Sequence, residues 1–367
     1  MMKIALVVPG GVDRSGEYRV IPALLALIKR LALEDEVHVF ALAQEAAPGC
    51  WDLVGARVHN MGAGSAVPRV VAAIYRESRP TPFQIVQSIW SGASGLAAVA
   101  AANVLRIPSV VHVAGGELVA LPHIRYGGRL RWHGRAREAL VLRGATAVTA
   151  ASRPMIDAIA ALGITARRIP LGVDLDTWPL RQPVRRAVGS LARLIHVASL
   201  NPVKDQATLL HALASLSVSG PAFHLDSVGE DTLSGEIQAT AAKLGLMDRI
   251  TFHGFLTQRQ LRPLMERAHV NVISSRHEAG PLAVLEAAAV GVPTVGTAVG
   301  HIAEWAPRAA LSVPVGDARA LASAIARLLE NEDLRLEIAR EAQRIAGAED
   351  AGHTAFQFRK LYADIRC

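Results

Sequence analysis

The chain has 367 residues, of which 51% are apolar and 19% charged, with 39 Lys/Arg against 32 Asp/Glu. This length suggests two domains, and the composition is that of a globular chain, which excludes a disordered or fibrous protein. Two cysteines, Cys50 and Cys367, exclude a disulfide-stapled scaffold and a cysteine-based metal set, and they favour a reducing compartment. We therefore expect a cytoplasmic protein.

One uncharged stretch, residues 80–105, is 26 residues long and therefore long enough to cross a bilayer. Its glutamines, serines and two prolines argue against a membrane span, and its apolar residues are mostly alanine. We expect a buried strand in FQIVQSIW and a buried helix in GASGLAAVAAANVL. The N-terminal MMKIALVVPGG is too short to be a secretory signal and predicts a first strand instead.

Strands and helices are predicted to alternate in both halves of the chain. In the first half we expect strands in KIALVVP, EVHVFAL, FQIVQSI, SVVHVA and AVTAAS, with helices near 17–32, 66–78, 92–105, 127–142 and 153–162. In the second half we expect strands in LIHVASL, FHLDSVG, ITFHGF, VNVISS and PTVGTA, with helices near 204–216, 234–245, 257–266, 281–290 and 317–330. Such alternation with apolar strands favours parallel sheets covered on both faces. The sequence therefore predicts an α/β protein of two doubly wound, Rossmann-like domains, 1–172 and 178–349, joined near 167–186.

Ligands of doubly wound sheets bind at the carboxyl ends of the strands. Several polar or glycine residues directly follow predicted strands or end them: Gly10, Gly11, His112, Ser199 to Lys204, Gly229, Glu230 and Glu278. This clustering favours an enzyme that binds its ligand at the strand ends over a scaffold protein.

The segment SSRHEAGPLAVLEAAAVGVPTV, residues 274–295, predicts a loop, a helix, a tight turn and a buried strand. The backbone N–H groups around Gly280, Leu282 and Ala283 would lie at the helix start, which attracts anions. Glu278 precedes this terminus and Glu286 lies on the second helical turn. An anion site with two flanking carboxylates suits a nucleotide sugar. The alternative is that Glu278 caps the helix electrostatically and Glu286 is solvated.

Three further residues are candidates with plain structural alternatives. Lys204 is one of five lysines beside 34 arginines, and its ammonium suits the leaving diphosphate, although it could be a surface lysine. His112 could donate to a phosphate or a sugar hydroxyl, or be a hydrogen-bonded core histidine. Gly11 could admit a ligand close to the backbone or simply form a tight turn.

Positive charge is concentrated in the first half of the chain. Residues 1–177 carry 19 Lys/Arg and 13 Asp/Glu, whereas residues 178–367 carry 20 and 19. In the stretch 125–143, six arginines, among them Arg125, Arg129, Arg131 and Arg135, accompany only one acid, Glu138. This patch suits an anionic membrane surface or an acidic acceptor, or it is a solvated helix face. Nucleic acid is disfavoured because the usual motifs are absent.

Taken in order, these segments resemble glycosyltransferase family 4, a retaining family with the GT-B fold. HEAGPLAVLEAAAVGVPTVGTAVGHIAEW is similar to the family's E-x7-E region, VASLNPVKDQATLLHAL to its phosphate-binding strand and helix, and IPLGVDLDTW to its interdomain linker. The resemblance implies an N-terminal acceptor-binding domain, a C-terminal donor-binding domain facing it across a cleft, and a last helix, 350–367, that returns to the N-terminal domain.

The resemblance also implies roles for single residues. Glu278 would bind donor-sugar hydroxyls and Glu286 the nucleotide ribose, while the backbone from Gly280 to Ala283 and Lys204 would hold the diphosphate. His112 would lie beside the transferred sugar, and Gly11 would let the N-terminal domain close over donor and acceptor. Ser199 and Gly229 belong to the same strand-end region. No metal or other cofactor is expected, and the acidic pair in the linker, Asp174 and Asp176, follows no strand that could deliver a metal site.

The chain departs from the family at two positions. Ser199 stands where the family usually has an arginine, which removes one charged contact to the diphosphate, and Leu171 stands where the linker usually has an asparagine. We expect a retaining transferase that moves a sugar from a nucleotide diphosphate sugar to a saccharide or lipid-linked acceptor, in polysaccharide or glycolipid assembly. The alternatives are a sugar-nucleotide epimerase of the same fold, an NAD-dependent oxidoreductase, disfavoured by the lack of a G-x-G-x-x-G segment, and a non-catalytic sugar-binding homologue.

Overall fold

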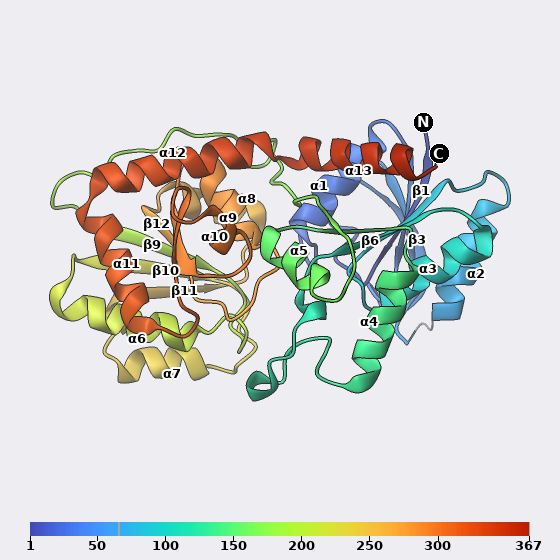
Figure 1. The fold of residues 1–367 in the computed structure, drawn as a ribbon. Helices are drawn as coiled ribbons and strands as arrows, with labels where there is room; N and C mark the ends of the chain where they lie inside the picture. The colour runs from blue at the N-terminus through green and yellow to red at the C-terminus, as the bar shows by residue number, and fades with distance from the viewer. Residues whose placement is uncertain (65–66, 367) are drawn as a thin grey trace. The chain divides into compact units, whose positions relative to one another are not determined.

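The computed structural model describes residues 1–64 and 67–366, which fold as two α/β units (Figure 1). The first unit is Met1–Gly172 together with the segment from Ala351 onward, and the second is Val173–Asp350. Residues 173–177, which the sequence suggested as linker, belong to the second unit because Val173 and Trp178 are buried in its core. Cys367 and the first residue of the helix expected at 66–78 lie outside the described residues.

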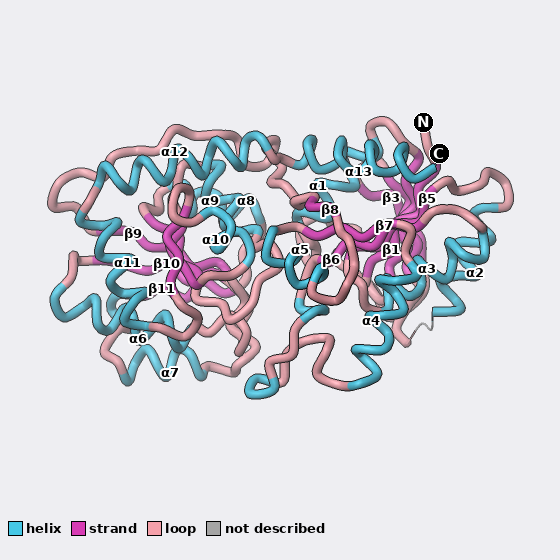
Figure 2. The backbone as a smooth tube through the Cα atoms, in the orientation of Figure 1, coloured by secondary structure: helices cyan, strands magenta, loops and turns pink. Residues whose placement is uncertain are grey.

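The first unit is built on an eight-stranded sheet in the order β3-β4-β2-β1-β5-β6-β7-β8. Its strands are β1 (Lys3–Val8), β2 (Glu36–Ala41), β3 (Gly49–Leu53), β4 (Ala56–Asn60), β5 (Ile85–Ile89), β6 (Ser109–Val113), β7 (Ala147–Ala150) and β8 (Arg167–Arg168). Neighbouring strands run parallel except β3 and β4, which are antiparallel. Every residue of β1, β5 and β6 is buried, as expected of central strands covered on both faces (Figure 2).

The described residues of this unit form six α-helices: α1 (Pro22–Ala32), α2 (Val67–Ser78), α3 (Ala93–Leu105), α4 (Trp132–Gly144), α5 (Arg153–Ala160) and α13 (Ala351–Arg366). The last of these packs against α1 and buries Phe358 and Tyr362 in the same apolar cluster as Leu6. Thr354 also donates a hydrogen bond to the carbonyl of Pro170 at 2.8 Å. The predicted return of the C-terminal helix to the N-terminal domain is therefore confirmed.

The second unit is built on a six-stranded, all-parallel sheet in the order β11-β10-β9-β12-β13-β14. Its strands are β9 (Ala192–Val197), β10 (Phe223–Val228), β11 (Ile250–Gly254), β12 (Val270–Ile273), β13 (Thr294–Thr297) and β14 (Ala310–Val313). Its helices are α6 (Gln206–Ser219), α7 (Glu236–Lys243), α8 (Gln258–Glu266), α9 (Leu282–Ala289), α10 (Gly300–Trp305), α11 (Ala318–Glu330) and α12 (Glu332–Ala348). From β9 the chain builds outward to β11, and it then returns to place β12 on the other side of β9. The strand order thus reverses between β9 and β12.

The uncharged stretch 80–105 forms β5 and α3 of the first unit. No helix within the described part of the chain has both the length and the apolar character that a bilayer crossing requires.

Two helices begin about five residues later than predicted. Residues 13–20 form a turn in place of the first turns of α1, with an antiparallel bridge between Val12 and Val20, so that the helix begins at Pro22, a residue suited to a first turn. Residues 121–131 precede α4 as an irregular loop closed by a bridge between Leu121 and Tyr126. At both places the sequence has helical periodicity, but the chain forms a local turn closed by a β-bridge.

The prediction omitted β3, β4, β8, β14, α10 and α12. The edge strand β3 is partly exposed, and β3 and its neighbour β4 interrupt their apolar residues with charged or polar ones, so neither has the apolar run that marks a central strand. Helix α12 did leave a signal in the sequence. Asn331 caps it by accepting a hydrogen bond from the N–H of Leu334 at 3.0 Å, and Ile338, Ala342 and Ala346 recur at helical spacing on its buried face.

Candidate functional site

Lys204 and Glu278 form an ion pair at the carboxyl edge of the second sheet. Lys204 follows β9 and Glu278 follows β12, and the Lys204 Nζ lies 2.6 Å from the Glu278 Oε1. The same Oε1 accepts a hydrogen bond from the Ser275 hydroxyl at 2.6 Å. The side chains of Lys204 and Glu278 are 26% and 12% exposed, so both are partly shielded from water. The pair lies where the strand order reverses, which is the usual ligand position in open α/β sheets.

The two loops that carry this pair are joined by further contacts. The Ser274 hydroxyl donates to the carbonyl of Lys204 at 2.8 Å, and the N–H of Arg276 donates to the carbonyl of Val203 at 2.7 Å. The Arg276 Nη2 also lies 2.9 Å from the Oδ2 of the buried Asp205. These contacts hold both loops in fixed positions, and they bring a second cation, Arg276, beside the loop of Lys204.

Helix α9 begins directly after the Glu278 loop. It starts at Leu282, one residue later than predicted, because Pro281 has an extended ψ of 119° and is the N-cap. No side chain caps this terminus. The N–H groups of Leu282 and Ala283 have no acceptor within the helix, as in the first turn of any α-helix. The predicted helix start, with Gly280 in the loop before it, is therefore present directly after Glu278, and its attraction for an anion stays a prediction.

Glu286 is buried on α9 with 3% of its surface exposed, so the alternative of a solvated Glu286 is wrong. Burial raises its pKa to about 7, although a hydrogen bond with the Gln258 side chain opposes the shift. Gln258 is itself held by the indole N–H of the buried Trp178, which donates to its Oε1. Glu286 is thus a carboxyl group that changes protonation state near neutral pH inside the second unit.

Ser199 and Gly229 lie in the strand-end region but have structural partners. The carbonyl of Ser199 accepts a hydrogen bond from the Gln206 Nε2 at 3.1 Å. A Cβ at Gly229 would lie only 2.0 Å from the carbonyl oxygen of Ala198, and the residue has a φ of +150°. Glycine is therefore required at 229 so that β10 can leave the sheet beside the end of β9, whatever else this residue does.

His112 is fully buried at the end of β6 in the first unit. Its Nδ1 lies 2.9 Å from the Thr149 hydroxyl, and its ring meets the ring of Phe358 edge to face. Burial lowers its pKa to about 3, so that it is neutral at physiological pH. This environment matches the core-histidine interpretation. The Nε2 has no hydrogen-bond partner among the described residues.

Gly11 follows β1 and has a φ of +82°. Its N–H donates to the Gln44 Oε1 at 2.7 Å, and a Cβ here would meet the Ile21 side chain at 2.5 Å. The positive φ and the nearby Ile21 side chain explain why a glycine is needed in this tight turn. Its predicted role in domain closure stays a prediction.

A polar cluster at the ends of β5 and β6 was not predicted from the sequence. Trp90, directly after β5, has a φ of +75°, which is rare for a residue other than glycine. The Glu117 Oε1 accepts hydrogen bonds from the N–H groups of Ser91 and Ala114 at 3.1 and 3.4 Å. Burial raises the pKa of Glu117, although these N–H groups oppose the shift. Its place just after the strand VVHVA could have revealed it.

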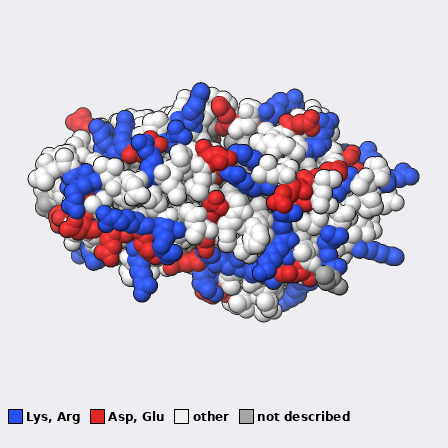
Figure 3. All heavy atoms as spheres, turned by 90° about the horizontal axis from the view of Figure 1, so that it is seen from above, with Lys and Arg blue, Asp and Glu red and all other residues white. Residues whose placement is uncertain are grey.

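Glu138 is the single acid in the arginine-rich stretch, and it is not solvated. It is 4% exposed, and burial raises its pKa to about 7, although Arg129, whose Nη1 lies 3.6 Å from its Oε1, opposes the shift. Arg125, Arg131 and Arg135 are exposed. Figure 3 shows the molecule from above, and on that face basic and acidic side chains are intermingled.

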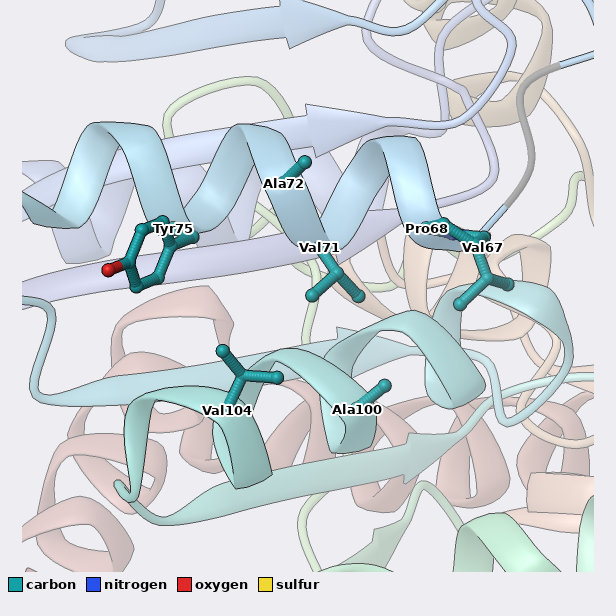
Figure 4. A pocket seen from close by; sticks show the side chains of 7 residues that line it. All are labelled: Val67, Pro68, Val71, Ala72, Tyr75, Ala100 and Val104. Carbon is teal, nitrogen blue, oxygen red and sulfur yellow. The ribbon is translucent and has the colours of Figure 1, made fainter.

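An apolar groove runs between α2 and α3 of the first unit (Figure 4). Its lining residues are Val67, Pro68, Val71, Ala72, Tyr75, Ala100 and Val104. None of them carries a charge that could hold a phosphate, so the groove does not compete with the Lys204 region as an anion site.

Each unit matches a known family model. Residues 20–172 match the model described as "Glycosyl transferase 4-like domain", and residues 184–345 match "Glycosyl transferases group 1". The chain belongs to the GT4-type glycosyltransferases. The family predicted from the E-x7-E region and the phosphate-binding strand and helix is thereby confirmed.

Curated glycosyltransferases match part of the chain. A putative glycosyltransferase of Bacillus subtilis, EpsF, is 34% identical over 134 residues, which are 35% of this chain and 34% of the relative. The amylovoran biosynthesis glycosyltransferase AmsK of Erwinia amylovora is 27% identical over 183 residues, 47% of this chain and 44% of the relative. The chain thus matches less than half the length of either relative.

Solved structures resemble the whole chain. Sucrose-phosphate synthase from Thermosynechococcus elongatus superposes with a TM-score of 0.81 at 20% identity, covering 100% of this chain and 99% of that one. HepE from Anabaena, in complex with UDP-glucose, superposes with a TM-score of 0.75 at 20% identity, covering 99% and 100%. These similarities confirm the predicted GT-B fold of two Rossmann-like domains.

Proposed function

We propose that this protein is a retaining, metal-independent glycosyltransferase that moves a sugar from a nucleotide diphosphate sugar to an acceptor hydroxyl. The observation that carries the proposal is the Lys204–Glu278 ion pair at the ends of the neighbouring strands β9 and β12. Glu278 lies in the loop that leads into α9, whose first turn has no side-chain cap. Cation, carboxylate and helix terminus together suit a ligand that has both phosphates and hydroxyls.

In the proposed reaction, the acceptor oxygen forms a bond to the anomeric carbon as the bond from that carbon to the diphosphate oxygen breaks on the same face. The acceptor proton passes to the leaving diphosphate oxygen, so that no protein nucleophile is needed. Negative charge grows on the diphosphate as its bond to the sugar breaks. The Lys204 ammonium and the N–H groups of Leu282 and Ala283 would stabilise this charge electrostatically, which is the contribution a metal ion makes in other transferases.

The two glutamates would recognise the rest of the donor. Glu278 would accept hydrogen bonds from sugar hydroxyls, and both of its hydrogen bonds to Lys204 and Ser275 end on Oε1. Glu286 would bind the ribose. A carboxyl group with a pKa of about 7 can accept a hydrogen bond from a hydroxyl in either protonation state, and in its neutral state it can also donate one.

A uridine nucleotide and a polysaccharide acceptor are the first choices to test. HepE, which shares the fold, is described in complex with UDP and glucose, and AmsK is a glycosyltransferase of amylovoran biosynthesis. These names support a nucleotide sugar as donor and a saccharide or lipid-linked saccharide as acceptor. The cytoplasmic location stays a prediction from the sequence.

Arg276 is proposed to supply the charge that Ser199 lacks. Its guanidinium pairs with Asp205, the residue next to Lys204. Arg276 would then offer the diphosphate a second cation from the β12 loop, in place of the arginine that the family usually has at position 199. If Arg276 has this role, Arg276→Ala will weaken nucleotide binding while Ser199→Ala leaves it unchanged.

The experiment that tests the function measures thermal stability against a panel of nucleoside diphosphates and nucleotide sugars, followed by transfer and donor hydrolysis with the donor that stabilises most. A ligand that binds only the folded protein must raise the Tm. We expect one nucleotide to stabilise the wild type, and we expect Lys204→Ala and Glu286→Ala to lose the shift. If no nucleotide raises the Tm of the wild type, even at millimolar concentration, the proposed donor site is wrong.

The second candidate is a non-catalytic sugar-binding homologue, which the absence of an arginine at position 199 favours. It would bind a nucleotide sugar without transfer or hydrolysis. The sugar-nucleotide epimerase is distinguished by its product, because it would change the sugar of the donor with no acceptor present.

The exposed arginines Arg125, Arg131 and Arg135 are proposed to contact an acidic acceptor or an anionic lipid surface. Trp132 lies among them and is 73% exposed, and tryptophan is favoured where water meets lipid. This proposal is independent of the donor site, since all four residues belong to the first unit.

A further inference from the structure

Three metal-ligating side chains meet on one face of the first sheet, among residues that the transferase proposal does not use. His38 lies on β2, His59 on the neighbouring β4 and Glu77 in the last turn of α2. One potential ligand atom from each lies within 4.8 Å of the others. We propose that His38, His59 and Glu77 form a binding site for a divalent transition-metal ion, with Zn²⁺ as the preferred ion.

The hydrogen bonds of His38 prepare its Nδ1 as a ligand atom. Its Nε2 lies 2.9 Å from the Glu36 Oε1, and a carboxylate oxygen can only accept a hydrogen bond. The Nε2 therefore carries the proton, and the lone pair is on Nδ1. A carboxylate that accepts a hydrogen bond from the remote nitrogen is the usual partner of a metal-bound histidine, because it orients the ring and strengthens the ligand.

His59 presents its Nε2 to the same point. The His38 Nδ1 and the His59 Nε2 are 3.0 Å apart, and the other nitrogen of His59 faces the Cys50 Sγ at 3.6 Å. The His59 ring is buried, with 7% of the residue exposed. Since the His38 Nδ1 carries no proton, the 3.0 Å separation is that of a hydrogen bond donated by the His59 Nε2–H. To bind an ion, His59 would change tautomer, so that its proton moves to the Nδ1 that faces the Cys50 Sγ.

The distances are compatible with a tetrahedral ion. Bonds of about 2.0–2.1 Å to nitrogen or oxygen place neighbouring ligand atoms roughly 3.4 Å apart in a tetrahedron. The two histidine nitrogens are already near this separation, and Glu77, half-exposed at the end of its helix, needs a modest movement toward them. Two imidazoles and a carboxylate with one position open to water form a common zinc ligand set.

The local charge also favours a cation. Glu36 and Glu77 each contribute a carboxylate, and Lys3, whose Nζ lies 3.3 Å from the Glu36 Oε1, pairs with only one of them. Arg57, on the same strand as His59, is paired with Asp52 at 2.9 Å. A bound ion would connect the end of α2 to strands β2 and β4, next to the antiparallel edge of the sheet.

The test uses the full chain, made metal-free with a chelator and titrated with Zn²⁺ by calorimetry and with Co²⁺ by visible absorption. We expect one ion per chain, tetrahedral Co²⁺ bands and a Tm raised by Zn²⁺. His38→Gln and Glu77→Gln should each abolish this stoichiometric site. Glu36→Gln, which removes the carboxylate that pairs with His38 and Lys3 but leaves the three ligands in place, should weaken binding about 10–100-fold.

Two control variants separate this site from adventitious binding. His211→Gln, an exposed histidine on α6, should bind Zn²⁺ as the wild type does. Cys50→Ser should also bind normally, because its sulfur faces the nitrogen of His59 that is not used. Glu77 is half-exposed, so Glu77→Gln should keep the metal-free Tm even if His38→Gln does not fold. The proposal is wrong if the wild type binds no stoichiometric ion. It is also wrong if Glu77→Gln and His38→Gln bind Zn²⁺ as the wild type does.

Discussion

Lys204 and Glu278, 74 residues apart in the chain, are joined by a 2.6 Å ion pair because their strands, β9 and β12, are neighbours in the sheet. The reversal of strand order leaves no crossover helix between these two strand ends. Both side chains therefore reach the same point at the carboxyl edge of the sheet, next to the start of α9. This relationship makes the pair the first target for mutation.

Lys204→Ala should weaken binding of a nucleoside diphosphate about 10- to 100-fold. The physical reason is the loss of one charged hydrogen bond to a phosphate, worth about 1.5–3 kcal/mol. Isothermal titration with UDP and the other common nucleoside diphosphates measures the effect. Lys243→Ala removes an exposed lysine at the end of α7 and is the matched control, with affinity expected to stay unchanged. If the wild type and Lys204→Ala bind nucleoside diphosphates with equal affinity, Lys204 does not contact the diphosphate.

Glu286→Gln should change how stability depends on pH. The Glu286 pKa is about 7 in the folded protein against an ordinary value of 4.5, so the folded state holds the proton more tightly than the unfolded state. The tighter binding of this proton adds fully to the free energy of unfolding below pH 4.5, and that contribution is lost as pH rises through about 7. The shift corresponds to about 3 kcal/mol. Relative to wild type, Glu286→Gln should gain stability between pH 4.5 and 7.5.

Urea denaturation at pH 4.5, 6 and 7.5 measures this difference. Because other buried groups titrate in both proteins, only the difference between variant and wild type isolates Glu286. A constant difference across the three pH values would contradict the raised pKa.

His112→Ala should destabilise the protein by about 2–4 kcal/mol. The ring is fully buried against Phe358 of α13, and its removal leaves a cavity as well as an unpaired Thr149 hydroxyl. Chemical denaturation, monitored with a spectroscopic probe in the first unit, measures the change in the free energy of unfolding. Loss of transfer activity with unchanged stability would instead support the catalytic role that the family resemblance implies.

Replacing Arg125, Arg131 and Arg135 together by glutamine should reduce binding to anionic vesicles while donor binding stays unchanged. Each arginine near an anionic surface contributes about 1 kcal/mol, so the combined effect should be on the order of 100-fold. Flotation with anionic and neutral vesicles, at low and high salt, measures it. Wild-type protein that binds both kinds of vesicle equally, or neither, would exclude the membrane version and leave the acidic acceptor.

Local patterns in the sequence were sufficient for much of the fold. Apolar runs of strand length alternating with helical periodicity predicted two doubly wound domains, since each pattern reports how a short segment buries its own side chains. The segment from Glu278 to Glu286 likewise predicted a helix start with an anion-attracting terminus, because loop, proline and helix formers are all local features.

Tertiary structure alone decided which distant residues meet. The ion pair of Lys204 with Glu278 depends on strand order, and the burial of Glu286 and Glu138 depends on which helix faces pack against the core. The meeting of His38 with His59 depends on the register of β2 and β4, two strands of which one was absent from the prediction. Strand order, register and helix packing follow from the free energy of burying surfaces far apart in the chain. No local window of sequence contains that information, and both candidate sites of this protein depend on it.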